Sequence, residues 1–322
     1  MIGVALAKRL MRMREVVPAA PTLEAYLAAT GEGPEVFRHA MFLAGSEAVR
    51  RAIMLKSSTS KYQSELAYPW DAYFGIDLRP MLAGARALDL GCFNGGRGVG
   101  WFERYGLAHL SGIDVDPVFI QAAEQFAAAR HVPSDYRVAV GEQLPYDPDT
   151  FDAVLSFDVF EHVQSVARTL AECWRVLKAG GRLFVVFPGF YHPTEHHLSL
   201  TTSVPCLHWF IAPRTLVRAY DEIIAERGDG AYWYRRSKPE LQPWERGQTI
   251  NGTTLEGFLR LVRGSPWTVV LHSRRAVGSI GRNVSRRPAV KWLMRPLGML
   301  TSVPGLREFV LHRNTFVLEK RS

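Results

Sequence analysis

Short apolar runs alternate with segments of helical periodicity from Ala85 onward, and this alternation restricts the fold more than any other feature of the chain. The apolar runs predict strands at 86–90, 110–113, 136–140, 153–157 and 183–187. The periodic segments between them predict helices at 97–105, 116–130 and 165–178, with Gly180 and Gly181 ending the last. Strands that alternate with helices form a parallel sheet with helices on both faces, so the pattern predicts a doubly wound α/β fold.

The alternation stops after Phe187 and returns towards the C-terminus. A stretch rich in Pro, Trp, Tyr and His is followed by a predicted helix at 253–263 and strands at 268–272 and 315–318. The expected fold is a Rossmann-like, seven-stranded, mostly parallel sheet. It carries a cap insertion at about 188–250, after the fifth strand, and a basic insertion at about 273–307, between the last two strands.

The N-terminal part has a different texture. Helical spacing of apolar residues predicts helices at 2–14 and 34–56, and the run Ser57–Ser60 is expected to loosen the chain after the second helix. Residues 1–80 are therefore predicted to be a helical extension or lid, and residues 81–322 the main domain.

The composition is that of a soluble globular protein, with 47% hydrophobic and 22% charged residues. No apolar run reaches the ~18–20 residues that span a bilayer. Basic residues follow the short apolar N-terminus instead of preceding it, which is the wrong order for a secretory signal. The cysteines Cys92, Cys173 and Cys206 are far apart and match no disulfide or metal pattern, so a reducing cytoplasm is expected.

The positive charge is concentrated at the C-terminal end. Residues 260–322 contain 13 Lys and Arg against two acids, so they carry +11 of a chain whose net charge is +8, and the remainder carries −3. Either an anionic partner or a solvated basic face accounts for this asymmetry. Because residues 273–307 interleave basic and apolar side chains, peripheral contact with an anionic membrane at its inner face is one expectation.

A glycine-rich turn connects the first predicted strand to the first predicted helix. The turn contains Gly91, Gly95 and Gly96, and Asp89 lies two residues before its first glycine. This spacing departs from the G-x-G-x-x-G pattern of dinucleotide sites, and a carboxylate at the strand end suits a cationic ligand better than a pyrophosphate. Asp114, at the end of the second strand, is placed to accept hydrogen bonds from ribose hydroxyls.

Four motifs in series resemble the class I S-adenosylmethionine-dependent methyltransferases of the small-molecule-modifying, type 11 kind. They are LDLGC at 88–92, GIDVDP at 112–117, GEQLPYDPDTFDAVLS with FEHV at 141–163, and LAECWRVLKAGGRLFVVFP at 170–188. The resemblance implies that S-adenosyl-L-methionine is the cofactor. Phe93 departs from the pattern, because the family turn usually has glycine there, and its side chain must point out of the turn.

The resemblance also implies a role for each position that matches a motif. Asp89 and the Gly91–Gly95 turn would face the methionine part of the cofactor. Asp114, followed by Val115, would face the ribose, and Glu142 with Gln143 the adenine. Ser156 to Asp158, at the end of the fourth strand, would lie beside the transferable methyl group, and Ser156 and Phe157 are the cofactor-binding residues expected there.

Histidines are the candidates for catalysis, because imidazole can remove a proton from an acceptor hydroxyl near neutral pH. His162 follows the fourth strand, and His192, His196 and His197 follow the fifth, where a loop should cover the acceptor pocket. Each could be a base or a structural side chain. The loop histidines with His208 match no familiar metal-ligand spacing, so no metal is predicted.

The expected reaction is direct displacement of the methyl group onto a small-molecule, glycan or lipid-linked acceptor, with oxygen as the expected atom. Two alternatives stay open at this stage. A nucleic-acid methyltransferase would use the basic C-terminal region, but no recognisable nucleic-acid module accompanies it, so a nucleic-acid partner is disfavoured. A non-catalytic S-adenosylmethionine-binding protein would need the same cofactor motifs.

Overall fold

The computed structural model describes residues 3–16, 24–25, 28, 46–193, 198, 201–227, 251–276 and 295–321. The chain divides into two compact units. The first combines residues 1–53 with 191–251, and the second combines residues 54–190 with 252–322. The predicted division at residue 80 stays a prediction.

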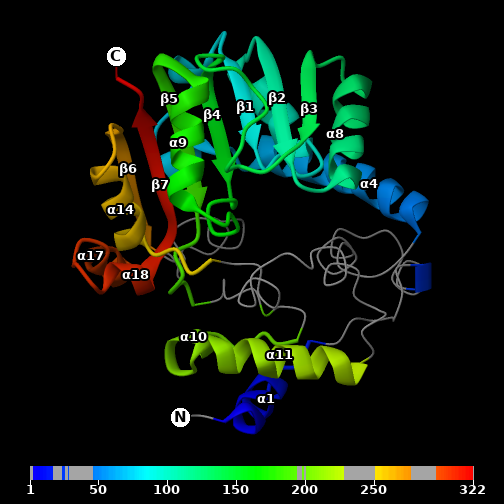
Figure 1. The fold of residues 1–322 in the computed structure, drawn as a ribbon, viewed down its shortest axis with the longest axis vertical. Coiled ribbons are helices and arrows are strands. Elements are labelled where there is room, and N and C mark those ends of the chain that lie inside the picture. The colour runs from blue at the N-terminus through cyan, green and yellow to red at the C-terminus, as the bar shows by residue number, and fades with distance from the viewer. Residues whose placement is uncertain are drawn as a thin grey trace. The chain divides into compact units, whose positions relative to one another are not determined.

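The second unit is built on a seven-stranded sheet, which Figure 1 shows as a row of arrows. Its order is β3-β2-β1-β4-β5-β7-β6, and β7 runs antiparallel to both of its neighbours while the other pairs are parallel. The strands are β1 (Arg86–Leu90), β2 (His109–Asp114), β3 (Ser134–Val138), β4 (Phe151–Phe157), β5 (Leu177–Phe187), β6 (Thr268–Ala276) and β7 (Leu311–Glu319). The predicted Rossmann-like, seven-stranded, mostly parallel fold is confirmed.

Alternate residues of each central strand enter the two hydrophobic cores on opposite faces of the sheet. Leu88 of β1 and Val154 of β4 belong to one core, whereas Ala87 and Leu155 belong to the other. Both faces are apolar because helices cover both, which is the arrangement that the near-continuous apolar runs predicted. The first core includes residues of α9 (Val166–Val176) and α14 (Leu255–Arg263).

The second core is covered mainly by α7 (Gly96–Tyr105) and α8 (Pro117–Ala129). Asp116 begins α8 as predicted, because its carboxylate accepts a hydrogen bond from the backbone N–H of Val118 at 2.9 Å. Four short helices complete the unit and are α5 (Asp71–Phe74), α6 (Arg79–Leu82), α17 (Arg295–Leu300) and α18 (Arg307–Val310).

Two local predictions were wrong. The helix α4 (Glu47–Ala67) runs straight through Ser57–Ser60, because Ser58 packs against Asn94 and Gly96 and this packing outweighs the local preference of serine. At the other place, α9 ends at Val176, and Gly180 and Gly181 lie inside β5 instead of ending the helix.

The first unit contains α1 (Val4–Arg12), α10 (Leu207–Phe210) and α11 (Pro213–Arg227). Ala7 and Met11 of α1 are fully buried, and Lys8 forms ion pairs with Glu222 and Glu226 of α11. Large parts of the predicted cap and basic insertions, including 228–250 and 277–294, lie outside the described residues. Within the described ranges, none of the helices is long and apolar enough to cross a membrane.

Candidate functional site

The turn between β1 and α7 can be made only with glycine at two positions. Gly91 and Gly95 have φ of 74° and 73°, in the left-handed region that other residues rarely adopt. A Cβ on Gly91 would collide with the Val159 side chain, and one on Gly95 would lie 2.8 Å from the Ala123 Cα. The backbone of this turn therefore passes very close to the Val159 side chain, just after β4, and to the backbone of α8.

Phe93 does not disrupt the turn. It takes a left-handed φ of 50°, and its ring packs edge-on against Phe119, with centroids 4.5 Å apart. Its backbone N–H donates to Asp114 Oδ2 at 3.0 Å, which ties the turn to the end of β2. The departure from the usual glycine thus leaves the turn joined to the predicted ribose-binding acid.

Asp89 is buried at the end of β1, with only 3% of its surface exposed. Its carboxylate lies against the first turn of α7, because a Cβ on Gly98 would be 2.5 Å from Asp89 Oδ2. Burial raises the pKa of Asp89 to about 7; Arg97 opposes this shift, and Asp114 and Glu65 add to it. Because burial disfavours the charged form of this carboxyl group, a cationic ligand beside it would stabilise the carboxylate.

The ends of β2, β1 and β4 are neighbours in the sheet, so the predicted residues at these ends lie along one edge. The register aligns Leu90 with Ile113 on one side and with Ser156 on the other. Asp114 follows Ile113 directly, and it also accepts a hydrogen bond from the Asp116 N–H at 3.2 Å. Val115 beside it is 45% exposed.

Glu142 and Gln143 follow β3 in the loop that leads to β4. One carboxylate oxygen of Glu142 accepts a hydrogen bond from the Ser165 N–H at 3.0 Å, just before α9. Gln143 is exposed, and its backbone N–H donates to the Val140 carbonyl. A carboxylate has several acceptor positions, so Glu142 can bind a second donor while it holds this loop.

Ser156 and Phe157 end β4. The Ser156 hydroxyl is fully buried and has no hydrogen-bond partner in the part of the chain that the structure describes. The Phe157 ring is contacted by two side chains. The guanidinium carbon of Arg97 lies 3.8 Å from its centre, and the Tyr73 ring packs edge-on with centroids 5.1 Å apart.

Sequence reasoning missed the contribution of α4 to this site. Gly96 packs so closely against the Ser58 carbonyl of α4 that a Cβ would collide with it, and the Ser58 hydroxyl donates to the Asn94 carbonyl at 2.7 Å. Glu65 of the same helix lies 3.7 Å from Arg97. No local signal could have found these contacts, since they join residues more than thirty positions apart in the sequence.

Sequence reasoning also missed Tyr73 and Arg313, which contact Phe157 and Asp158 at the end of β4. Asp158 has a left-handed φ of 57° and forms an ion pair with Arg313 of β7 at 3.1 Å. Burial raises the pKa of Tyr73, and the charges of Arg313, Asp158, Arg97 and Glu65 all act on its phenol. The end of β4 thus brings an ion pair and a phenol next to Phe157.

The structure describes one of the three predicted catalytic histidines, His162. His162 follows β4 in the second unit, and its Nε2 lies 3.8 Å from Glu161 Oε1. His192 and His208 are buried in the first unit, while His196 and His197 lie outside the described residues. Over the described ranges, no group of three or more His, Cys, Asp or Glu is arranged to hold a metal ion.

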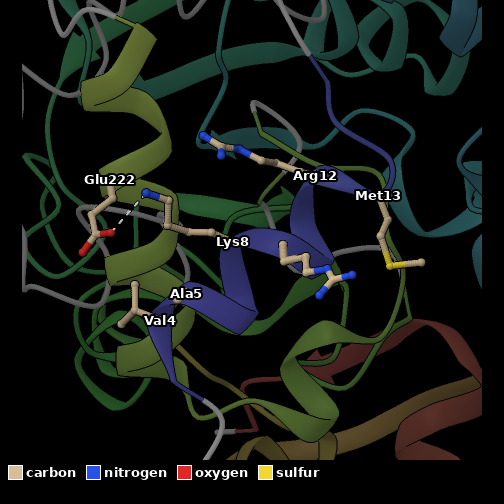
Figure 2. A pocket seen from close by; sticks show the side chains of 7 residues that line it. Val4, Ala5, Lys8, Arg12, Met13 and Glu222 are labelled. Atoms are coloured by element: carbon tan, nitrogen blue, oxygen red, sulfur yellow. Dashed lines mark hydrogen bonds and ion pairs between the residues drawn. The ribbon is translucent and has the colours of Figure 1, made fainter.

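A separate cavity lies in the first unit, along α1 (Figure 2). Its lining consists of Val4, Ala5, Lys8, Arg9, Arg12, Met13 and Glu222. None of the predicted cofactor-binding residues is among these lining residues.

Comparison with known proteins agrees with the geometry of the second unit. Residues 88–185 match the family model described as a methyltransferase domain. The chain is 39% identical over 111 residues to a ubiquinone biosynthesis O-methyltransferase of Xylella fastidiosa strain M23, covering 34% of this chain and 44% of that protein. A Marinobacter nauticus protein of the same name is 37% identical over 113 residues, covering 34% and 47%. The chain thus spans about half the length of the curated relatives it matches.

Among solved structures, one chain from the complex of the Haloferax volcanii Trm112 methyltransferase activator with a methyltransferase is 17% identical. The alignment covers 84% of this chain and 97% of that one, with a TM-score of 0.50, which shows a shared fold. The matched segment begins in β1 and ends in β5, so it contains the glycine turn and the strand ends that carry Asp89, Asp114 and Ser156. The chain therefore contains an S-adenosyl-L-methionine-dependent methyltransferase domain of the class I, type 11-like family.

Proposed function

We propose that the protein transfers the methyl group of S-adenosyl-L-methionine to an oxygen atom of a small-molecule, glycan or lipid-linked acceptor. The observation that carries this proposal is the alignment of Asp89, Asp114 and Ser156 at the ends of three neighbouring strands. In open α/β sheets, ligands bind outside the carboxyl ends of the strands. The relatives are named O-methyltransferases, which supports oxygen as the atom that is methylated.

The residues at this edge fit the cofactor. Asp89 offers a buried carboxylate to the ammonium group of the methionine part, and the close-packed glycine turn allows the backbone to approach the ligand. Asp114, held by two backbone N–H groups, is oriented to accept from ribose hydroxyls. The buried Ser156 hydroxyl lies at the same edge and can donate a hydrogen bond.

When bound, the cofactor supplies a methyl group that is already activated by its positive sulfur. The protein then has to align the acceptor with that methyl group, exclude water and receive the proton of the hydroxyl. Phe157 forms an apolar wall at the end of β4, which favours exclusion of water. We propose His162, His196 or His197 as the base that receives this proton.

We assign the acceptor side of the site to the residues beyond Phe157. Tyr73 and the Asp158–Arg313 ion pair supply polar groups next to an aromatic wall. Burial raises the pKa of Tyr73, so its phenol stays protonated near neutral pH and can donate a hydrogen bond to an acceptor oxygen.

The test is a screen of hydroxylated small molecules, glycans and lipid-linked compounds with methyl-labelled S-adenosyl-L-methionine. The expected result is transfer of label to the oxygen of at least one of these classes, with S-adenosylhomocysteine formed in equal amount. The Asp114→Ala variant serves as the cofactor-site control and should transfer label more slowly. Tight cofactor binding without transfer to any class would favour the non-catalytic binding protein instead, and label on added RNA or DNA would favour a nucleic-acid methyltransferase.

A further inference from the structure

Arg97 is the second residue of α7, directly after the glycine turn, and it has no role in the assignments above. Its guanidinium carbon lies over the Phe157 ring at the end of β4, 3.8 Å from the ring centre. On the other side its Nε lies 3.7 Å from Glu65 Oε2, which is an ion pair but too long for a hydrogen bond. Over the described ranges, no hydrogen bond from the Arg97 side chain is found. Its N–H donors are thus available to a ligand.

Glu65 keeps Arg97 in this position. Its side chain is only 6% exposed, and Oε1 accepts a hydrogen bond from the Trp70 N–H at 2.8 Å, which fixes the carboxylate. Burial raises the pKa of Glu65, while the nearby Arg97 opposes that shift. A guanidinium between a fixed carboxylate and an aromatic ring has little freedom, so it is oriented before any ligand arrives.

The position of Arg97 matters because of its neighbour Asp89. Arg97 is the group whose charge most strongly opposes the raised pKa of Asp89, so the two side chains act on each other across the first turn of α7. An amino-acid group carries an ammonium and a carboxylate separated by a single carbon. Asp89 can attract the ammonium, but Asp89 and Glu65 together would repel the carboxylate unless a cation stood beside them.

We infer that Arg97 binds the carboxylate of the amino-acid part of S-adenosyl-L-methionine, and that Glu65 is the residue that positions it. The inference rests on the proposed function, since it concerns the same cofactor. The N-terminal end of α7 adds its partial positive charge, and charge-assisted hydrogen bonds from a guanidinium to a carboxylate are among the strongest that side chains form. The site thus presents an anion and a cation to a ligand that has both.

The test compares two ligands by calorimetry on the full chain. One is S-adenosylhomocysteine, and the other is its decarboxylated analogue, which keeps the amine, the ribose and the adenine but lacks the carboxylate. The wild-type protein should prefer S-adenosylhomocysteine. At a pH well above 7, where Asp89 is ionised, the affinity of Arg97→Met for S-adenosylhomocysteine should fall by about ten- to a hundredfold. The affinity for the analogue should change far less, because only the carboxylate loses its direct partner. Glu65→Gln should reduce the same preference partially.

Two further variants test whether the effect is specific to the carboxylate of the ligand. Arg104→Met removes another arginine of α7, one that pairs with Asp71, and should change neither affinity. Arg97→Lys keeps the charge without the planar fork and should retain part of the preference. If Arg97→Met and Arg97→Lys lose both ligands equally, or lose neither, the inference is wrong and Arg97 only braces Glu65 and Phe157. Failure of wild-type protein to bind either ligand would overturn the proposed function itself.

Discussion

The guanidinium carbon of Arg97 lies 3.8 Å from the centre of the Phe157 ring, so a side chain from the first turn of α7 rests on the last residue of β4. The same ring is contacted edge-on by Tyr73. Phe157 therefore contacts one group that includes Arg97 and Asp89 and another that includes Tyr73 and Asp158. We assign the first group to the cofactor and the second to the acceptor.

Cofactor binding should depend on pH through Asp89. The pKa of this carboxyl is raised to about 7, so it is mostly neutral below that pH and cannot attract an ammonium group. Affinity for S-adenosyl-L-methionine should therefore rise with pH through about 7 and level off above it. One pH unit below the pKa leaves about a tenth of the groups ionised, which gives roughly tenfold weaker binding at pH 6 than at pH 8.

Calorimetry at several pH values checks this dependence. The Asp89→Asn variant keeps the shape of the side chain but not its titration, and it should bind weakly with a flat profile between pH 6 and 8. A flat profile for the wild-type protein would show that Asp89 does not titrate with the cofactor.

Removing the polar groups beyond Phe157 should slow turnover without weakening cofactor binding. Tyr73→Phe deletes one hydroxyl, and we expect kcat/KM for the acceptor to fall about tenfold, as for one lost hydrogen bond. Arg313→Gln should reduce it further, because Asp158 then loses its ion-pair partner. Calorimetry with S-adenosylhomocysteine is the matched control, and a large loss of affinity there would move these residues to the cofactor side.

Stability should be sensitive to Gly96. A Cβ at this position would collide with the Ser58 carbonyl in the backbone of α4, which cannot yield as a flexible side chain would. We expect Gly96→Ala to lower the free energy of unfolding by about 1–3 kcal/mol, the usual cost of overpacking. Gly298→Ala is the control, because nothing lies within 4 Å of the added Cβ in α17. Equal denaturation midpoints for the two variants would contradict the close approach of α4 to the turn.

The loop histidines provide a prediction from sequence alone. His196→Ala and His197→Ala should each lower turnover and leave cofactor affinity nearly unchanged, because the loop after the fifth strand is expected to cover the acceptor. A chelator tests the alternative role as metal ligands. Loss of activity with chelator and recovery with Mg²⁺ or Mn²⁺ would replace the base hypothesis by a metal site.

The sequence predicted the sheet well because its strands are short, buried and separated by strong turn signals. Leu88 and Val154 point to one face and Ala87 and Leu155 to the other, so each strand reads as a continuous apolar run. The helix α4 was misjudged at Ser57–Ser60, because serine weakens a helix locally but tertiary packing on Asn94 and Gly96 outweighs that preference.

The residues of the candidate site could be predicted where a single sequence motif contains both a strand end and the side chain that lies at the site. Asp89, Gly91 and Asp114 are of this kind, since each lies at the end of a strand that the apolar pattern identifies. Tyr73, Arg97 and Arg313 were missed because they reach Phe157 and Asp158 from other parts of the chain. Nothing in the local sequence around them indicates which strand end they approach.

Binding of S-adenosylhomocysteine to wild-type protein and to Asp114→Ala tests the central claim most directly. Asp135→Ala, which removes an exposed acid of β3 that pairs with Arg137, is the control. The account predicts that Asp114→Ala weakens binding by about 1–3 kcal/mol, since the ribose hydroxyls lose their acceptor, while Asp135→Ala and NAD competition have no effect. Unchanged affinity in a folded Asp114→Ala protein, or displacement of S-adenosylhomocysteine by NAD, would contradict the placement of this cofactor at the strand ends.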